Sequence, residues 1–296
     1  MTFSATDAAF EGFRVVRRHP LAVVFWAALH LVFLAAFFGV FGSDLASFMA
    51  ATETLQGTDP TPVELESLSP TLLGLFALAA PAGLLLGAIL NAAVARAVVR
   101  QKDKAFGYLR LGADELRVLA VTVVMFIVFG VGTMVAFTLV GVCAGLAAAA
   151  NAGLGWLVGI VLGLGAVAAV VWMMVRLSLA VPVTIAERRI SLFDSFALTK
   201  GHALSLLGMA VIAFIMTFLV GMLMTVVALP LTMTTGGLEQ LAALDGASTL
   251  DILRAAGPAI AVYVVVNAVV SALQQAVLYA PFSAAYLGLK GLPQEG

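Results

Sequence analysis

The stretch "LAVVFWAALHLVFLAAFFGVFG" at residues 21–42 decides the fold, because His30 is its only ionisable residue. A helix needs about 20 mostly apolar residues to cross the hydrocarbon core of a bilayer. The stretch is also longer than the roughly 7–15 residues of a signal-peptide core, and acidic residues are mixed with the basic ones before it. We therefore expect an uncleaved first membrane span.

The rest of the chain repeats this pattern. Of its 296 residues, 62% are hydrophobic and 10% are charged, whereas an ordinary soluble domain has roughly 45–50% apolar and about 25% charged residues. We predict an all-α polytopic membrane protein, a bundle of six transmembrane helices. The predicted spans are about residues 20–42, 71–99, 118–149, 155–185, 204–233 and 257–288.

Charges between the spans predict the orientation. Residues 43–70 contain five carboxylates and no Lys or Arg, whereas residues 100–117 contain five Lys and Arg residues. Because Lys and Arg are retained on the cytoplasmic side, we expect both termini in the cytoplasm. Short loops and this bias suit a multi-pass protein of a bacterial inner membrane.

A short polar phrase occurs twice. "FEGFRVVRRHPLAV" at residues 10–23 aligns without gaps with "FDSFALTKGHALSL" at 193–206, and "FGYLRLGADELRVL" from Phe106 is a weaker third copy. We predict one transmembrane domain over 1–296, built from three parallel two-helix repeats. Chance similarity between apolar sequences is the alternative. The predicted repeats are 1–103, 104–189 and 190–296.

Each phrase is predicted to be a short amphipathic cytoplasmic helix. In the first copy, Phe3, Phe10, Phe13 and Val16 fall on one side of a helical wheel, and Asp7, Glu11, Arg14 and Arg18 fall on the other. Such a helix either binds the lipid surface or a partner, or only orients the next span. His19 and His202 occupy the same position in the two aligned phrases. They either bind a phosphate headgroup or sense pH, or are ordinary interfacial residues. The interfacial candidates are Arg17, Arg18, His19, Lys200 and His202.

Residues 176–209, "RLSLAVPVTIAERRISLFDSFALTKGHALSLLGM", contain a recognisable motif. The segment resembles the membrane-domain family found beside some glycerophosphodiester phosphodiesterases and in YciC-like uncharacterised proteins. The resemblance implies a membrane protein that sometimes accompanies lipid-derived substrates, and not the phosphodiesterase reaction. Ala203 and Leu204 replace the usual aromatic residue. The residues that fit are Pro182, Glu187, Ser195, Leu198, Thr199, Gly201, Leu206, Leu207 and Gly208.

Arg176 is the most informative single residue. It lies six positions before Pro182, and Gln275 lies six before Pro281, so the repeat places both at equal depth. A charge at this depth normally faces the bundle interior or snorkels to the interface. We predict a polar pocket that binds an anionic headgroup; the alternative is a structural Arg near a helix kink. The predicted pocket residues are Arg176, Gln275, Gln274, Asn91 and Asn267.

Catalytic motifs are absent from the sequence. There is no HExxH or Cys/His cluster, no Walker-type loop and no GxSxG. We expect no cofactor and no metal, and the net charge of −1 argues against nucleic acid as a partner. The favoured function is a non-enzymatic membrane protein that binds or organises anionic lipid or a membrane or cytoplasmic protein partner. The alternative is a transporter or permease subunit for a small or lipid-like substrate; an intramembrane enzyme ranks last.

Overall fold

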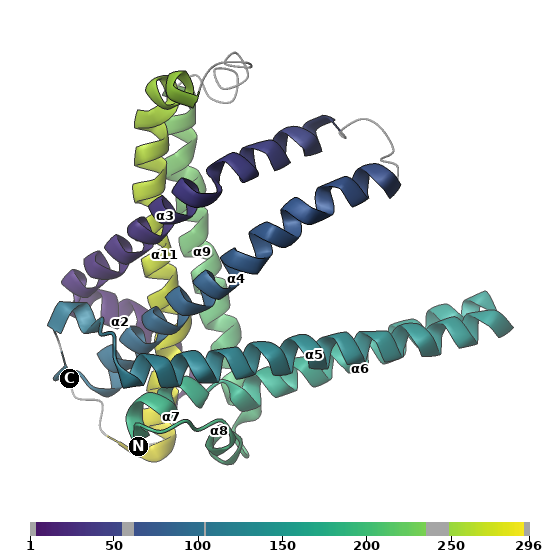
Figure 1. Ribbon diagram of the computed structural model, residues 1–296. Coiled ribbons are helices and arrows are strands. Elements are labelled where there is room, and N and C mark those ends of the chain that lie inside the picture. Colours follow the sequence, from purple (N-terminus) through teal and green to yellow (C-terminus); the bar gives the residue numbers. More distant parts are fainter. Residues whose placement is uncertain (1–3, 55–61, 104, 235–248, 293–296) are drawn as a thin grey trace.

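The computed structural model describes residues 4–54, 62–103, 105–234 and 249–292 (Figure 1). Every secondary-structure element in these ranges is helical. The long helices are α3 (Pro20–Thr54), α4 (Pro62–Val99), α5 (Ala113–Ala150), α6 (Ala152–Leu177), α9 (Ala203–Thr234) and α11 (Thr249–Lys290). The short ones are α1 (Ala5–Ala9), α2 (Glu11–Arg18), η1 (Ala105–Tyr108), α7 (Ala180–Glu187) and α8 (Phe193–Leu198).

The prediction of six membrane spans is confirmed. Six helical stretches in the described residues are long and apolar enough to cross a bilayer, and they coincide with the predicted runs. The span expected at 155–185 differs from the prediction, because it consists of two helices, α6 and α7. Pro182 has no backbone N–H for the Ser178 carbonyl, so the helical hydrogen-bond ladder is interrupted there.

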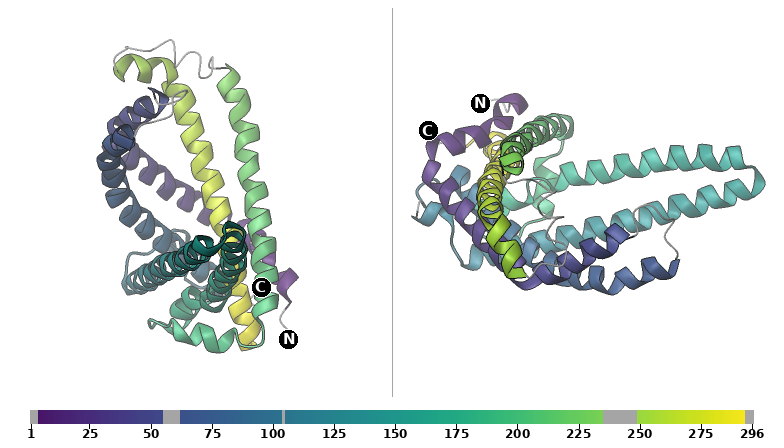
Figure 2. Two further views of the ribbon diagram at one scale, coloured as in Figure 1. Left: turned by 90° about the vertical axis from the view of Figure 1, so that its right-hand side faces the viewer. Right: turned by 90° about the horizontal axis from the view of Figure 1, so that it is seen from above.

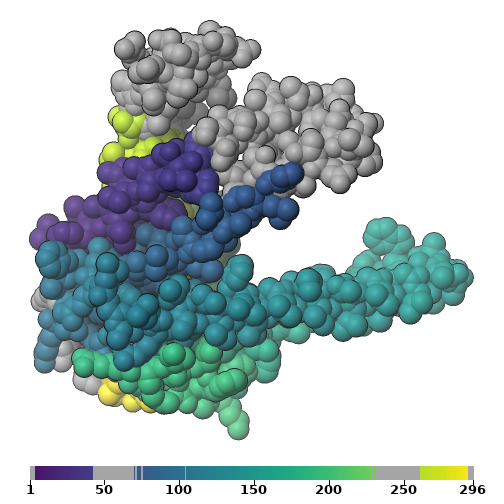
Figure 3. All heavy atoms as spheres, viewed as in Figure 1, coloured from purple at the N-terminus to yellow at the C-terminus, as the bar shows by residue number. Residues whose placement is uncertain are grey.

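The long helices form three antiparallel hairpins, α3–α4, α5–α6 and α9–α11 (Figures 1 and 2). The hairpins meet at one end of the molecule and diverge from it, and the α5–α6 hairpin projects farthest from the others (Figure 3). We call the end where they meet the base. Helix α11 is central there, because it packs against α9, α3, α4 and α2.

Small side chains let the helices approach closely at the base. Residues 92–95 of α4 and Ala272, Ala276 and Ala280 of α11 are buried, and small residues are typical of helix contacts inside membranes. Gly12 of α2 lies directly against α11, since a Cβ atom there would be 2.4 Å from the Cα of Val277. Away from the base, large apolar side chains are exposed, as expected for a surface solvated by lipid.

The first predicted amphipathic helix, which corresponds to α1 and α2, is packed differently from the prediction. Glu11 was expected on a water-facing side, but it is 2% exposed. Its carboxylate lies 3.1 Å from Arg14 and 3.3 Å from Arg18, which neutralise it beside α11. Phe10 and Phe13 are exposed on the outer side, whereas Phe3 lies outside the described residues. The segment therefore buries Glu11 against the protein, leaves Asp7 and Arg18 exposed, and directs Phe10 and Phe13 outward.

Candidate functional site

A polar cluster joins α4 to α11 inside the base. The Gln275 side chain donates to Asn91 Oδ1 at 3.1 Å, and the Tyr279 hydroxyl lies near the Asn91 side chain. Gln275 and Tyr279 are four residues apart and therefore lie on the same face of α11. The structure thus brings Asn91 and Gln275 together, although they come from different hairpins.

The cluster borders a cavity of about 600 Å³. The walls come from α4, α5, α6, α7, α9 and α11, so all three hairpins contribute. Most of the lining is apolar, as at Met125, Phe129 and Phe214. The polar lining residues are Asn91, Thr122, Ser178, Tyr279 and Ser283.

Two predicted pocket residues are used elsewhere. Gln274 donates to the Thr217 carbonyl of α9 at 3.3 Å. Asn267 accepts from Ser271 at 3.4 Å within α11. Gln274 therefore links the two helices of its own hairpin, and neither residue lines the cavity.

The expected position of Arg176 is corrected by the structure. Its guanidinium lies 5.7 Å from the Trp172 ring centre and 5.1 Å from that of Phe196. Trp172 and Arg176 are one turn apart on α6, whereas residues 171, 174, 175 and 178 face the cavity. Arg176 is therefore held by aromatic rings on the other side of the helix, and it does not line the pocket with Asn91.

We call residues 178–202, between α6 and α9, the second connector; it contains most of the recognised motif. The Ser195 hydroxyl donates to the Arg176 carbonyl at 2.7 Å and accepts from the Leu179 N–H at 3.2 Å. The Thr199 hydroxyl donates to the Ser195 carbonyl at 2.8 Å, and Gly201 has a φ of +81°. These motif residues therefore stabilise the break between α6 and α7 and the turn into α9.

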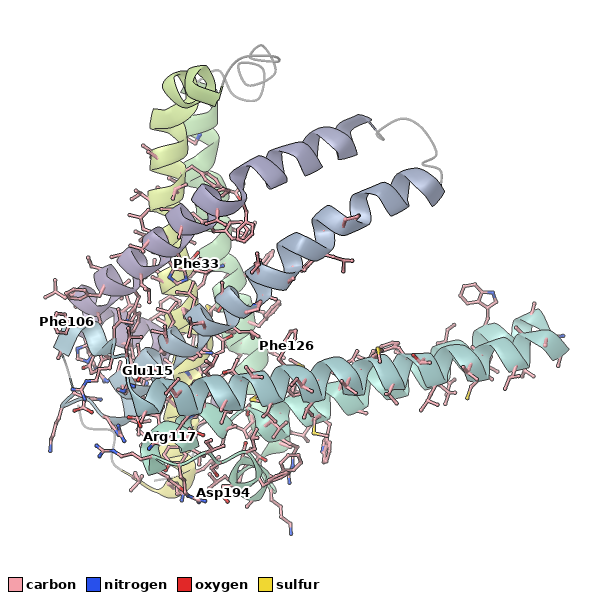
Figure 4. The ribbon with its side chains drawn as sticks, viewed as in Figure 1. Phe33, Phe106, Glu115, Arg117, Phe126 and Asp194 are labelled. Carbon is pink, nitrogen blue, oxygen red and sulfur yellow. The ribbon has the colours of Figure 1, made fainter. Side chains whose placement is uncertain are left out.

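We call residues 100–112, between α4 and α5, the first connector; it is anchored by charges that sequence reasoning missed. Arg96 is 1% exposed and forms an ion pair with the buried Glu115. Arg96 also donates to the Tyr108 carbonyl at 2.7 Å, and Glu115 accepts from the Gly112 N–H at 3.0 Å. Figure 4 shows Glu115 near the start of α5 at the base. The sequence did offer one indication of this ion pair. Arg96 lies inside an apolar run, where a charged residue requires a partner.

The first connector also contains a left-handed turn. Phe106, Gly107 and Tyr108 have φ values of 50°, 66° and 66°. Trp26 of α3 donates to the Gly107 carbonyl at 2.8 Å, which ties the turn to the first hairpin. Only a glycine fits at position 107, since a Cβ atom would be 2.9 Å from the Cα of Ala22.

The predicted interfacial residues are all at the base but have different environments. His19 is half-buried, and its Nε2 atom lies 3.3 Å from the Tyr108 hydroxyl. His202, Lys200 and Arg17 are exposed. The matched histidines therefore have different surroundings, and Arg18 contributes to neutralising Glu11.

Exposed charges outside the spans are perturbed by their neighbours. A hydrogen bond from the Ser191 hydroxyl, helped by the charge of Arg189, holds the pKa of Asp194 below its usual range. The Asp7 carboxylate raises the pKa of Arg14. Within the described residues, no three His, Cys, Asp or Glu side chains are grouped closely enough to hold a metal ion.

Comparison with protein-family models, curated proteins and solved structures finds no match. The resemblance of residues 176–209 to the phosphodiesterase-associated membrane domain therefore stays a prediction. The orientation across the membrane also stays a prediction. The six spans and the geometry of the base are the basis for a functional proposal.

Proposed function

We propose that this integral membrane protein has no enzymatic activity and binds membrane lipid in the cavity at its base. The cavity itself is the observation that carries the proposal. Its volume of about 600 Å³ lies within the ~300–1,000 Å³ of typical ligand pockets. Its wall is mostly apolar with a few polar groups, which is the composition expected for an amphiphilic ligand.

The arrangement of the hairpins supports entry from the bilayer. Helices α6 and α9 both line the cavity, but each packs mainly against its own hairpin partner, α5 or α11. The outer surfaces of α5, α6 and α9 are apolar and exposed, for example at Phe126, Trp172 and Phe218. A lipid chain therefore passes between surfaces that are already solvated by lipid chains.

The base also has features of a membrane-binding surface. Phe10, Phe13 and Phe193 are exposed, as are Arg17 of α2 and Lys200 just after α8. Helices α2 and α8 both lie at the base (Figure 1). Exposed aromatic residues together with basic ones favour contact with an anionic leaflet. We propose that the base lies on the cytoplasmic leaflet of a bacterial inner membrane and organises anionic lipid around the cavity entrance.

Native mass spectrometry of the gently extracted protein tests this function. Ala210 of α9 is a half-buried lining residue, so Ala210→Trp is expected to fill the cavity and remove most of the retained lipid. Ala168→Trp is the matched control, since Ala168 is exposed on α6 outside the cavity. Equal lipid retention in the two variants would contradict the proposal.

A further inference from the structure

The chemistry of the cavity wall restricts which lipid fits, a step that rests on the proposed function. Its lining residues include no Asp, Glu, Lys, Arg or His. The two arginines closest in sequence to lining residues have partners elsewhere. Arg96 is paired with Glu115, and Arg176 lies over the rings of Trp172 and Phe196.

A phosphate or carboxylate inside this cavity would have no charged partner. Burying an unpaired charge in an apolar environment is strongly unfavourable, whereas a neutral oxygen needs only one or two hydrogen bonds. The wall therefore favours a ligand whose head is an alcohol, an ester or a similar uncharged group. This differs from the anionic headgroup expected from the sequence.

Hydrogen-bonding groups for such a head are present on three helices. Thr122 of α5 is half-buried and Ser283 of α11 is 1% exposed, and both line the cavity. Asn91 of α4 lies between Gln275 and Tyr279. The Ser178 hydroxyl is occupied by the Val175 carbonyl at 2.8 Å. Thr122 and Ser283 thus place two further hydroxyl groups at the cavity wall.

We propose that the cavity binds a neutral single-chain lipid whose head oxygens hydrogen-bond with Thr122 and Ser283. The volume of about 600 Å³ supports one chain, because pockets of this size accommodate drug-sized molecules. The acyl chain then lies along the apolar wall formed by Met125, Phe129 and Phe214.

Photolabelling with two probes of identical acyl chain tests the proposal. A photoreactive monoacylglycerol supplies the neutral head, and a photoreactive lysophosphatidic acid supplies the anionic one. With the full-length protein in nanodiscs, the neutral probe is expected to label cavity peptides at least about tenfold more than the anionic probe. Equal labelling by the two probes, or stronger labelling by the anionic probe, would overturn the proposal that the bound lipid has a neutral head.

Side-chain variants test the assigned hydrogen bonds. Thr122→Val and Ser283→Ala are each expected to lower neutral labelling about 3- to 10-fold. Thr217→Val is the control, because the Thr217 hydroxyl donates to the Ala213 carbonyl outside the cavity. Unchanged labelling in both cavity variants would show that neither Thr122 nor Ser283 hydrogen-bonds with the head of the lipid.

The result also separates this inference from the function that it refines. Native mass spectra could show an anionic lipid that is lost in Ala210→Trp. In that case the proposal of a neutral head fails, but the proposal of lipid binding in the cavity stands. If neither probe labels the cavity and Ala210→Trp retains as much lipid as wild type, the lipid-binding function fails as well.

Discussion

The two connectors at the base perform the same task by different chemistry. The first holds α4 to α5 with the buried ion pair Arg96–Glu115 and a left-handed turn. The second holds α6 to α9 with the neutral hydroxyls of Ser195 and Thr199. The second connector contributes Ser178, Val181 and Pro182 to the cavity wall, and the first joins α4 to α5, which also line the cavity. The first connector is held by an ion pair, whereas the second is held by side-chain hydroxyls that hydrogen-bond to backbone N–H and C=O groups. The stability of the protein should therefore respond differently to substitutions in the two connectors.

Arg96→Met is expected to have the largest effect, because it leaves Glu115 buried without its partner. Breaking such a pair destabilises by about 3–5 kcal/mol. Reversible unfolding in bicelles measures the loss. The double variant Arg96→Met with Glu115→Leu should recover much of it, since both charges are then removed. Arg96→Met with wild-type stability would contradict the importance of charge in the first connector.

Gly107→Ala is expected to cause the next largest loss of stability. The added methyl group approaches the Cα of Ala22 at 2.9 Å, and the φ of 66° is unfavourable for alanine. We expect a loss of about 2 kcal/mol in the free energy of unfolding. Gly112→Ala is the matched control in the same connector, because its φ is −158° and its Cβ would meet only Glu115 Oε2, at 3.7 Å. Similar losses for both variants would exclude the turn as the cause.

Ser195→Ala tests the second connector. It removes the hydroxyl that donates to Arg176 and leaves the buried Leu179 N–H without its acceptor. The expected loss is about 1–3 kcal/mol in the same unfolding assay. Ser205→Ala, at an exposed position of α9, should change little. If Ser195→Ala destabilised as much as Arg96→Met, the contrast between the connectors would disappear.

Asp194→Asn should have the smallest effect and a defined pH dependence. The pKa of Asp194 is lowered mainly by the Ser191 hydroxyl, so its ionised form is favoured in the folded state. That contribution is present at neutral pH and is lost as the pH falls through the lowered pKa. Melting temperatures of wild type and variant should differ slightly at pH 7, and the difference should shrink as the pH falls below the usual pKa of Asp towards the lowered one. A difference that grows towards low pH would contradict the assignment.

Hydropathy predicted the spans well because bilayer thickness constrains helix length directly. The break between Leu177 and Ala180 agrees with the alternative interpretation of Arg176 as a structural residue near a helix kink, although hydropathy did not locate the break. The Arg96–Glu115 pair was missed because Arg96 was included in an apolar run. Pairing depends on how the connector folds back, which composition alone does not indicate.

The predicted site was right about one contact and wrong about another. Gln275, which was predicted to lie at the same depth as Arg176, hydrogen-bonds with Asn91 of the neighbouring helix α4. Arg176 has that depth too, but the angular position of a residue on its helix decides which neighbour it faces. Depth follows from sequence position, whereas the rotation of α6 is set by packing against α5, α8 and α9.

A structure determined in a lipid nanodisc tests the central claim most directly. The account predicts elongated density between α6 and α9 that ends beside Thr122, Tyr279 and Ser283. It would be contradicted by α6 packed directly against α9, with side chains filling the volume of the cavity.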